Sequence, residues 1–205
     1  LPVRVDTLTA YLRNEYYALY PLYNFYFTRD AAVTIGNQAL ICRMANKVRM
    51  RESLIMDAIY RYSGAFECGV VDANVDQPET SEVIMEGGDI LIAREDILIV
   101  GNGVRTTPQG IDFIVDRFCK AHPSGKLHVL VQQLPSEPES FIHLDMVFTL
   151  LDRDKCMIFR PLIEQASQYQ TVHITIEQGR VESIRPVAGL LPALRSLGMD
   201  LKPLV

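Results

Sequence analysis

The sequence lacks the features that mark nucleic-acid-binding, membrane-spanning and secreted proteins. Its 205 residues carry a formal net charge of -5, whereas phosphate binding needs a basic surface. No apolar run reaches the ~18 residues that a membrane span requires, and Leu1 opens the chain without the regions of a signal peptide. We expect a cytoplasmic protein that binds neither nucleic acid nor membranes, and the missing initiator Met indicates that an N-terminal portion is absent.

Cysteine and histidine are scarce and widely spaced. The four cysteines are Cys42, Cys68, Cys119 and Cys156. Without a CxxC pair in a chain of this size, free thiols are favoured over disulfides. The histidines form neither HxxxH nor HxH spacing, so we expect no dedicated zinc site. We also expect no other metal and no cofactor.

The composition, with 48% hydrophobic and 22% charged residues, is ordinary for a globular protein. Along the chain, the predicted secondary-structure elements recur in a repeated order. Apolar runs around polar turns predict hairpins, and apolar residues at helical spacing predict helices. The predicted elements are, in order, a helix at 7–20, a hairpin turning at 36–38, a helix at 49–63, a hairpin at 89–100, a helix from Pro108 to about Ala121 and a strand at 127–131.

A third round of the same elements follows. Strands at 146–151 and 155–159 flank a polar turn, a further hairpin at 171–184 turns at Gly179, and a helix covers 188–197. The polar segment 71–82 is interpreted as a surface loop. Repetition of a strand–strand–helix–strand unit in one α/β domain is the resulting prediction.

Three short motifs lie where apolar strands begin. They are Phe27-Thr28-Arg29-Asp30, Glu86-Gly87-Gly88-Asp89 and His143-Leu144-Asp145. Taken singly, each is more ordinarily a turn, a cap or a structural pair. Taken together, their carboxylates would suit a guanidinium, whose five N–H donors are matched best by bidentate acids. A His–Glu pair beside them would supply a proton donor and acceptor for hydrolysis.

These motifs carry a resemblance to a known family. FTRD at 27–30, EGGD followed by VGNGVRTTPQGID at 100–112, and FIHLDMVFTLLDRD at 141–154 resemble arginine deiminase, in that family's order. EGGD is shared by the wider guanidine-modifying superfamily, whereas HLDMVFTLLDRD points to arginine deiminase itself. The resemblance runs from about Asn24 to the C-terminus.

The resemblance implies a fold and a reaction. The fold is the α/β-propeller, or pentein, in which five modules surround a central site; about three would be present here, at roughly 24–85, 86–140 and 141–205. The reaction is hydrolysis of L-arginine to L-citrulline and ammonia through a covalent cysteine–amidino intermediate, as a step of arginine catabolism.

The resemblance also implies roles for individual residues. Asp30 and Asp145 would clamp the substrate guanidinium, with His143 as general acid/base and Glu86 orienting it. The residues expected at the substrate carboxylate or in the wall of the site are Arg49, Arg105, Phe27 and Asn24. Without the resemblance, the two arginines would be interpreted as solvated surface charges. Asp89 is expected to be structural.

One part of the family pattern is missing. The nucleophile of this family is a cysteine near the C-terminus, after a glycine-rich loop, and this sequence ends without one. Cys156, between apolar neighbours, is expected to be an inert thiol. We therefore expect this piece to be inactive, and a truncated chain or proteolytic fragment explains it better than a natural short homologue. Exposed module edges would favour self-association into a homo-oligomer.

Two other functions stay open at this point. One is a different guanidine-modifying enzyme, such as an agmatine deiminase or an amidinotransferase, for which Arg49 and Arg105 discriminate because agmatine has no carboxylate. The other is a non-catalytic pentein-like binding or scaffold protein. The missing cysteine favours it, and the retained His143 and Glu86 argue against it.

Overall fold

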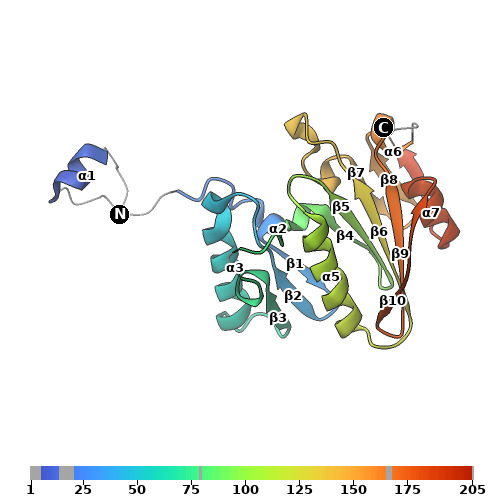
Figure 1. The fold of residues 1–205 in the computed structure, drawn as a ribbon, viewed down its shortest axis with the longest axis horizontal. Helices are drawn as coiled ribbons and strands as arrows, with labels where there is room; N and C mark the ends of the chain where they lie inside the picture. The colour runs from blue at the N-terminus through green and yellow to red at the C-terminus, as the bar shows by residue number, and fades with distance from the viewer. Residues whose placement is uncertain (1–5, 14–20, 79, 165–167, 205) are drawn as a thin grey trace.

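Three β-sheets lie side by side, with helices against them (Figure 1). The computed structural model describes residues 6–13, 21–78, 80–164 and 168–204. Over these residues the chain is a mixed α/β protein, as the sequence predicts. None of the described helices is both long and apolar enough to cross a membrane.

The first sheet follows from the predicted hairpin and helix. Strands β1 (Ala32–Ile35) and β2 (Gln38–Ile41) are antiparallel, and Gly36 in their turn has a φ of 59°, which glycine adopts readily. Helix α3 (Met50–Tyr62) comes next and β3 (Gly69–Asp72) then pairs parallel with β2.

The first sheet also corrects the interpretation of 71–82 as a surface loop. Its first residues complete β3, and α4 (Ala73–Asp76) follows directly. A four-residue strand beginning at a glycine gives little alternation. What makes it a strand is its parallel pairing with β2, which lies outside its own sequence.

The second sheet has the same element order and is larger. Strands β4 (Ile90–Arg94) and β5 (Ile97–Asn102) form the predicted hairpin, and β6 (Lys126–Gln133) pairs parallel with β5. Between them α5 (Pro108–Ala121) begins as predicted: the Thr107 hydroxyl accepts a hydrogen bond from the Gly110 amide. The later hairpin of β9 (Thr171–Glu177) and β10 (Arg180–Val187) is also present, but it extends this second sheet by pairing with β6.

The third sheet repeats the order once more. Strands β7 (Phe148–Asp152) and β8 (Lys155–Ile158) are antiparallel, the short α6 (Arg160–Ile163) follows, and α7 (Leu190–Ser196) confirms the predicted helix. Strand β11 (Lys202–Leu204), which the sequence did not predict, pairs parallel with β8. At the other end of the chain, α1 (Leu8–Arg13) covers part of the helix expected at 7–20, and residues 14–20 lie outside the described residues.

The central strands β5 and β6 of the second sheet are buried on both faces. Leu98 and Val100 of β5 belong to a hydrophobic cluster shared with α5 and the first sheet. Ile97 and Ile99 point the other way, into a cluster shared with α7 and the third sheet. Successive side chains of a strand alternate between faces, so the unbroken apolar run of β5 joins both cores and fixes the three sheets relative to one another.

A short helix precedes the first strand of every sheet. These are α2 (Thr28–Ala31) before β1, the 3-10 helix η2 (Gly87–Asp89) before β4, and the 3-10 helix η4 (Leu144–Met146) before β7. Each contains part of one of the three motifs. The middle one, η2, packs against both α2 and η4, so the repeated topology brings the motifs together.

Candidate active site

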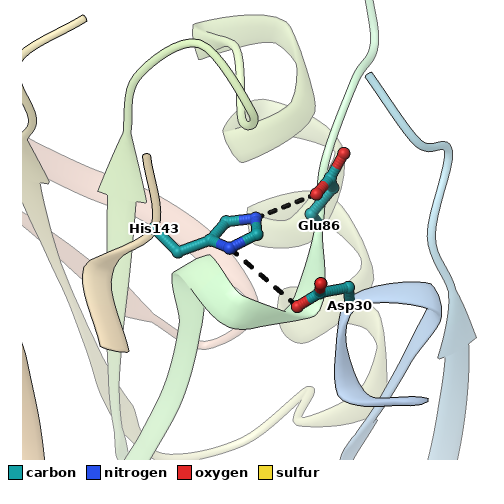
Figure 2. Close-up of side chains that lie close together, drawn as sticks. All are labelled: Asp30, Glu86 and His143. Atoms are coloured by element: carbon teal, nitrogen blue, oxygen red, sulfur yellow. Dashed lines mark hydrogen bonds and ion pairs between the residues drawn. The ribbon is translucent and has the colours of Figure 1, made fainter. Parts of the chain in front are cut away.

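Three buried polar side chains meet where these short helices pack. Asp30 comes from α2, Glu86 immediately precedes η2, and His143 immediately precedes η4. Figure 2 shows the imidazole of His143 between the two carboxylates: Nε2 lies 2.9 Å from Glu86 Oε2, and Nδ1 lies 4.0 Å from Asp30 Oδ1. The structure thus brings together one residue from each motif.

The two glycines of the second motif make this approach possible. A Cβ on Gly87 would lie 1.9 Å from the backbone oxygen of Arg29, and a Cβ on Gly88 would lie 2.9 Å from both Asp30 Oδ1 and His143 Cγ. Arg29 fixes the same turn, because its Nε donates to the Gly87 carbonyl at 3.1 Å and its Nη2 to the Ile90 carbonyl at 2.6 Å. The first motif therefore holds the second through its arginine.

Asp89 joins the second motif to the third. It is fully buried, and its carboxylate accepts a 2.6 Å hydrogen bond from the Thr106 hydroxyl and a 2.9 Å bond from the Leu144 amide. Burial raises the pKa of Asp89 to about 7, against these hydrogen bonds. By holding the Leu144 amide, Asp89 fixes the backbone beside His143.

The His143–Glu86 pair is polarised. Burial is the largest single effect and opposes charge on both groups. The hydrogen bond between them and the charges around them together outweigh it, so the pKa of His143 is raised and that of Glu86 is lowered. The positive charge of Arg105 adds to the lowering for Glu86. Glu86 is therefore the acceptor, His143 Nε2–H is the donor, and Nδ1 faces Asp30.

A cavity of about 240 Å³ opens beside this pair. Its lining includes seven of the residues expected from the sequence, and Glu86 lies directly behind them. The lining residues are Asn24, Phe27, Asp30, Arg49, Arg105, Ile142, His143, Asp145 and Met146. Burial raises the pKa of Asp145. A larger cavity of about 500 Å³ beside α6 and β10 has only one charged lining residue, Glu164, so the smaller cavity is the one equipped for chemistry.

Arg49 is paired more closely than the sequence suggested. It is buried, its Nη1 donates to Asp30 Oδ2 at 2.8 Å, and the same nitrogen lies 3.6 Å from Glu86 Oε2. Its Nε and Nη2 lie 2.9 and 2.8 Å from Glu52 Oε2. Glu52 is 1% exposed. Sequence reasoning missed Glu52, and the only available signal was its position three residues after Arg49 on one helix.

The metal-binding potential of the site is offset by this arginine. Ligand atoms of Asp30, Glu86 and His143 lie within 4.8 Å of one another, a spacing that would suit a metal ion. However, the cationic Arg49 Nη1 already contacts one carboxylate and lies near the other. In this structure the two carboxylates are therefore paired with the guanidinium of Arg49.

None of the four cysteines, all of which lie among the described residues, lines the cavity. Cys42 is close enough to Glu86 and Asp30 for their charges to act on it, but it is fully buried. Burial, followed by these carboxylates, raises its pKa strongly. Burial also raises the pKa of Cys119 and Cys156. These thiols are poor nucleophiles as they stand, because the thiolate is the reactive form.

Comparison with known proteins places the chain in a family. The sequence profile described as "Arginine deiminase" matches residues 4–192. The chain belongs to the arginine deiminase family. It is 32% identical over 192 residues to arginine deiminase of Bacillus cereus (strain ATCC 10987 / NRS 248), a match that covers 87% of this chain and 46% of that protein.

Other relatives agree with this membership. Arginine deiminase of Streptococcus pneumoniae serotype 19F (strain G54) is 32% identical over 202 residues, which cover 98% of this chain and 47% of that protein. The chain thus spans about half the length of the curated relatives it matches.

Two solved structures have a fold similar to that of this chain. The N-terminal domain of ArgZ bound to product, described as an arginine dihydrolase from cyanobacteria, aligns with a TM-score of 0.52 and 24% identity over 66% of this chain and 44% of that chain. The complex of AgrE with ornithine and NAD⁺ aligns with a TM-score of 0.53 and 21% identity, over 67% and 18% of the two chains.

Proposed function

We propose that this chain provides the guanidinium-binding part of an arginine deiminase, a cytoplasmic hydrolase that converts L-arginine to L-citrulline and ammonia. One observation carries the proposal: residues of three motifs, separated by more than fifty residues each, line or back one cavity beside a His–Glu pair. Membership of the arginine deiminase family supports the same reaction.

The charges of the cavity suit both ends of arginine. Asp30 and Asp145 would accept hydrogen bonds from the substrate guanidinium, because two carboxylates can bind its N–H groups in its plane. Arg105 lines the same cavity and would bind the substrate carboxylate together with Arg49, beside Asn24 and Phe27. Agmatine lacks that carboxylate, so these arginines favour arginine as the substrate.

The polarised pair would move the protons of the reaction. In the reaction proposed for this family, a cysteine thiolate attacks the guanidinium carbon and a C–N bond breaks as ammonia leaves, protonated through His143. Water, giving its proton to His143, then attacks the amidino-thioether carbon and releases citrulline and the thiolate. Glu86 would hold the imidazole in position and stabilise its cationic form throughout.

We also propose that the three sheets are modules of an α/β-propeller. Two strands, a helix and a further strand follow one another in the first two sheets, and a site motif lies ahead of the first strand of all three. The third sheet has the same elements, but the β9–β10 hairpin, which joins the second sheet, lies between α6 and α7. This regular placement supports modules at roughly 24–85, 86–140 and 141–205 of an α/β-propeller whose site lies at the centre.

Citrulline formation from L-arginine tests the proposed function. The protein expressed from the complete reading frame that encodes this sequence should turn over arginine, and Asp30→Ala and His143→Ala should each reduce kcat by about 10²–10⁴-fold. Asp116→Ala, on the exposed side of α5, is the matched control and should retain activity. Turnover of agmatine but not of arginine would contradict the substrate assignment.

The 205-residue chain, assayed alongside, tests the role of its cysteines. We expect no citrulline from it, because no cysteine lines the cavity among the described residues. Turnover by this chain would mean that one of its four cysteines is the nucleophile.

A further inference from the structure

The cavity already contains a guanidinium, and it belongs to the protein. Arg49 Nη1 lies 2.8 Å from Asp30 Oδ2 and 3.6 Å from Glu86 Oε2. Asp30 is the carboxylate that the proposed function assigns to the substrate. Arg49 therefore contacts the group for which the substrate would compete.

The two guanidinium groups exclude one another at Asp30. Oδ2 accepts a charge-assisted hydrogen bond from Arg49 at a distance typical of strong pairs. A substrate guanidinium bound to both oxygens of Asp30 would bring a second cation against Arg49 in a buried site, where like charges repel strongly. Arg49 Nη1 must leave Asp30 before such a ligand can bind it fully.

Glu52 is placed to hold Arg49 when that happens. Glu52 is almost completely buried, and its Oε2 contacts both Nε and Nη2 of Arg49, at 2.9 and 2.8 Å. These two nitrogens are on the side of the guanidinium away from Nη1. Both residues come from one segment at the start of α3, so their pairing does not depend on the position of Asp30 on α2.

We infer that Arg49 is an internal competitor for the guanidinium site and that Glu52 is the positioning residue that limits this competition. This inference rests on the proposed function for its substrate, L-arginine. In the empty site Nη1 neutralises Asp30. When a ligand guanidinium binds, Arg49 turns about its contacts with Glu52 and releases Asp30, and its freed N–H groups meet the ligand carboxylate.

The inference predicts opposite effects on ligands with and without a carboxylate. Arg49→Ala removes the competitor, so methylguanidine and agmatine should bind about tenfold more tightly, the equivalent of one charge-assisted hydrogen bond. The same variant should bind L-arginine more weakly, because the contact to its carboxylate is also lost. If Arg49 had only a structural role, its substitution would weaken the binding of every ligand.

Glu52→Gln should have a different signature. With its charged partner removed, Arg49 would shift its hydrogen bonds toward Asp30, and both agmatine and L-arginine should bind several-fold more weakly. Glu52→Asp keeps the charge on a side chain one methylene shorter and should restore part of the binding. The matched control is Glu82→Gln, at a residue whose carboxylate accepts a hydrogen bond from Gln109 at the exposed start of α5. It should leave the dissociation constants of L-arginine, agmatine and methylguanidine unchanged.

The measurement is the dissociation constant of L-arginine, agmatine and methylguanidine, by calorimetry, for the protein from the complete reading frame. Because removing Arg49 leaves buried acids without a partner, Arg49→Ala combined with Glu52→Gln serves if the single variant does not fold. Tighter methylguanidine binding in either variant supports the inference. Binding of methylguanidine that weakens as much as that of arginine overturns it. If the native protein binds methylguanidine but not L-arginine, the proposed function fails while the competition by Arg49 is still measured.

Discussion

Substituting Gly87 by alanine should destabilise the fold, because the backbone of Arg29 leaves no room for a side chain at this position. The added Cβ would lie 1.9 Å from the Arg29 backbone oxygen, so the backbone of α2 or η2 must move by about 1 Å. Overpacking against main chain costs about 3 kcal/mol. For a domain of this size, that cost lowers Tm by about 6–12 °C.

Two further glycines make the comparison specific. A Cβ on Gly69, in β3, would meet nothing closer than 3.7 Å, so Gly69→Ala should leave Tm unchanged or slightly higher. A Cβ on Gly88 would meet the side chains of Asp30 and His143 at 2.9 Å. Since these can shift, Gly88→Ala should cost only about 1 kcal/mol. In the protein from the complete reading frame, displacing the two site residues should reduce the proposed arginine turnover by about 10²-fold.

Thermal unfolding followed by circular dichroism measures the three variants side by side. Gly87→Ala should have the lowest Tm. When the same substitutions are assayed for citrulline formation in the protein from the complete reading frame, Gly88→Ala should show the largest loss of turnover relative to its loss of stability. An equal Tm for Gly87→Ala and Gly69→Ala would contradict the close approach of Gly87 to the Arg29 backbone. That result would mean that the first and second motifs are not packed backbone to backbone.

Three other outcomes follow from the structure. Thr107→Ala removes the N-cap of α5, whose hydroxyl accepts from Gly110, and should lower the free energy of unfolding by about 1 kcal/mol in urea titrations; an unchanged value would contradict the cap. Asp89 has a folded-state pKa of about 7, above its unfolded value, so its contribution to stability is present below about pH 4 and is lost as pH rises toward 7. Urea titrations from pH 4 to 7 should accordingly find a weaker decline in Asp89→Asn than in the native protein, and equal slopes would count against that raised pKa. Thiol titration of the native protein should modify Cys68 first and the three buried cysteines only on unfolding; rapid modification of Cys42 would show that it is accessible.

The elements that the sequence predicted well are those with local signals. The Gly36 turn, the Thr107–Pro108 helix start and the apolar runs of β4 and β5 each depend on residues within the element itself. Strands β3 and β11 were missed because each is three or four residues long and is stabilised by parallel pairing with a strand far earlier in the sequence. Such pairing leaves no periodicity to detect.

The site was predictable in its members but not in its pairing. Seven of the expected residues line one cavity and Glu86 contacts His143 behind it, because the motifs precede equivalent strands of the three sheets. The contact of Arg49 with Asp30 depends on a side-chain rotamer and on a neighbour from another element. Glu52 had no motif to mark it, since an acid three residues from an arginine on a helix is usually an exposed pair.

The position of bound L-arginine shows whether Asp30 and Asp145 bind the substrate guanidinium. A crystal structure of the His143→Ala variant, expressed from the complete reading frame and soaked with L-arginine, removes the acid/base group and should trap the substrate. We expect the substrate guanidinium within hydrogen-bonding distance of Asp30 and Asp145, and its carboxylate at Arg105. A structure in which arginine binds elsewhere, or with its carboxylate toward Asp30, would contradict it.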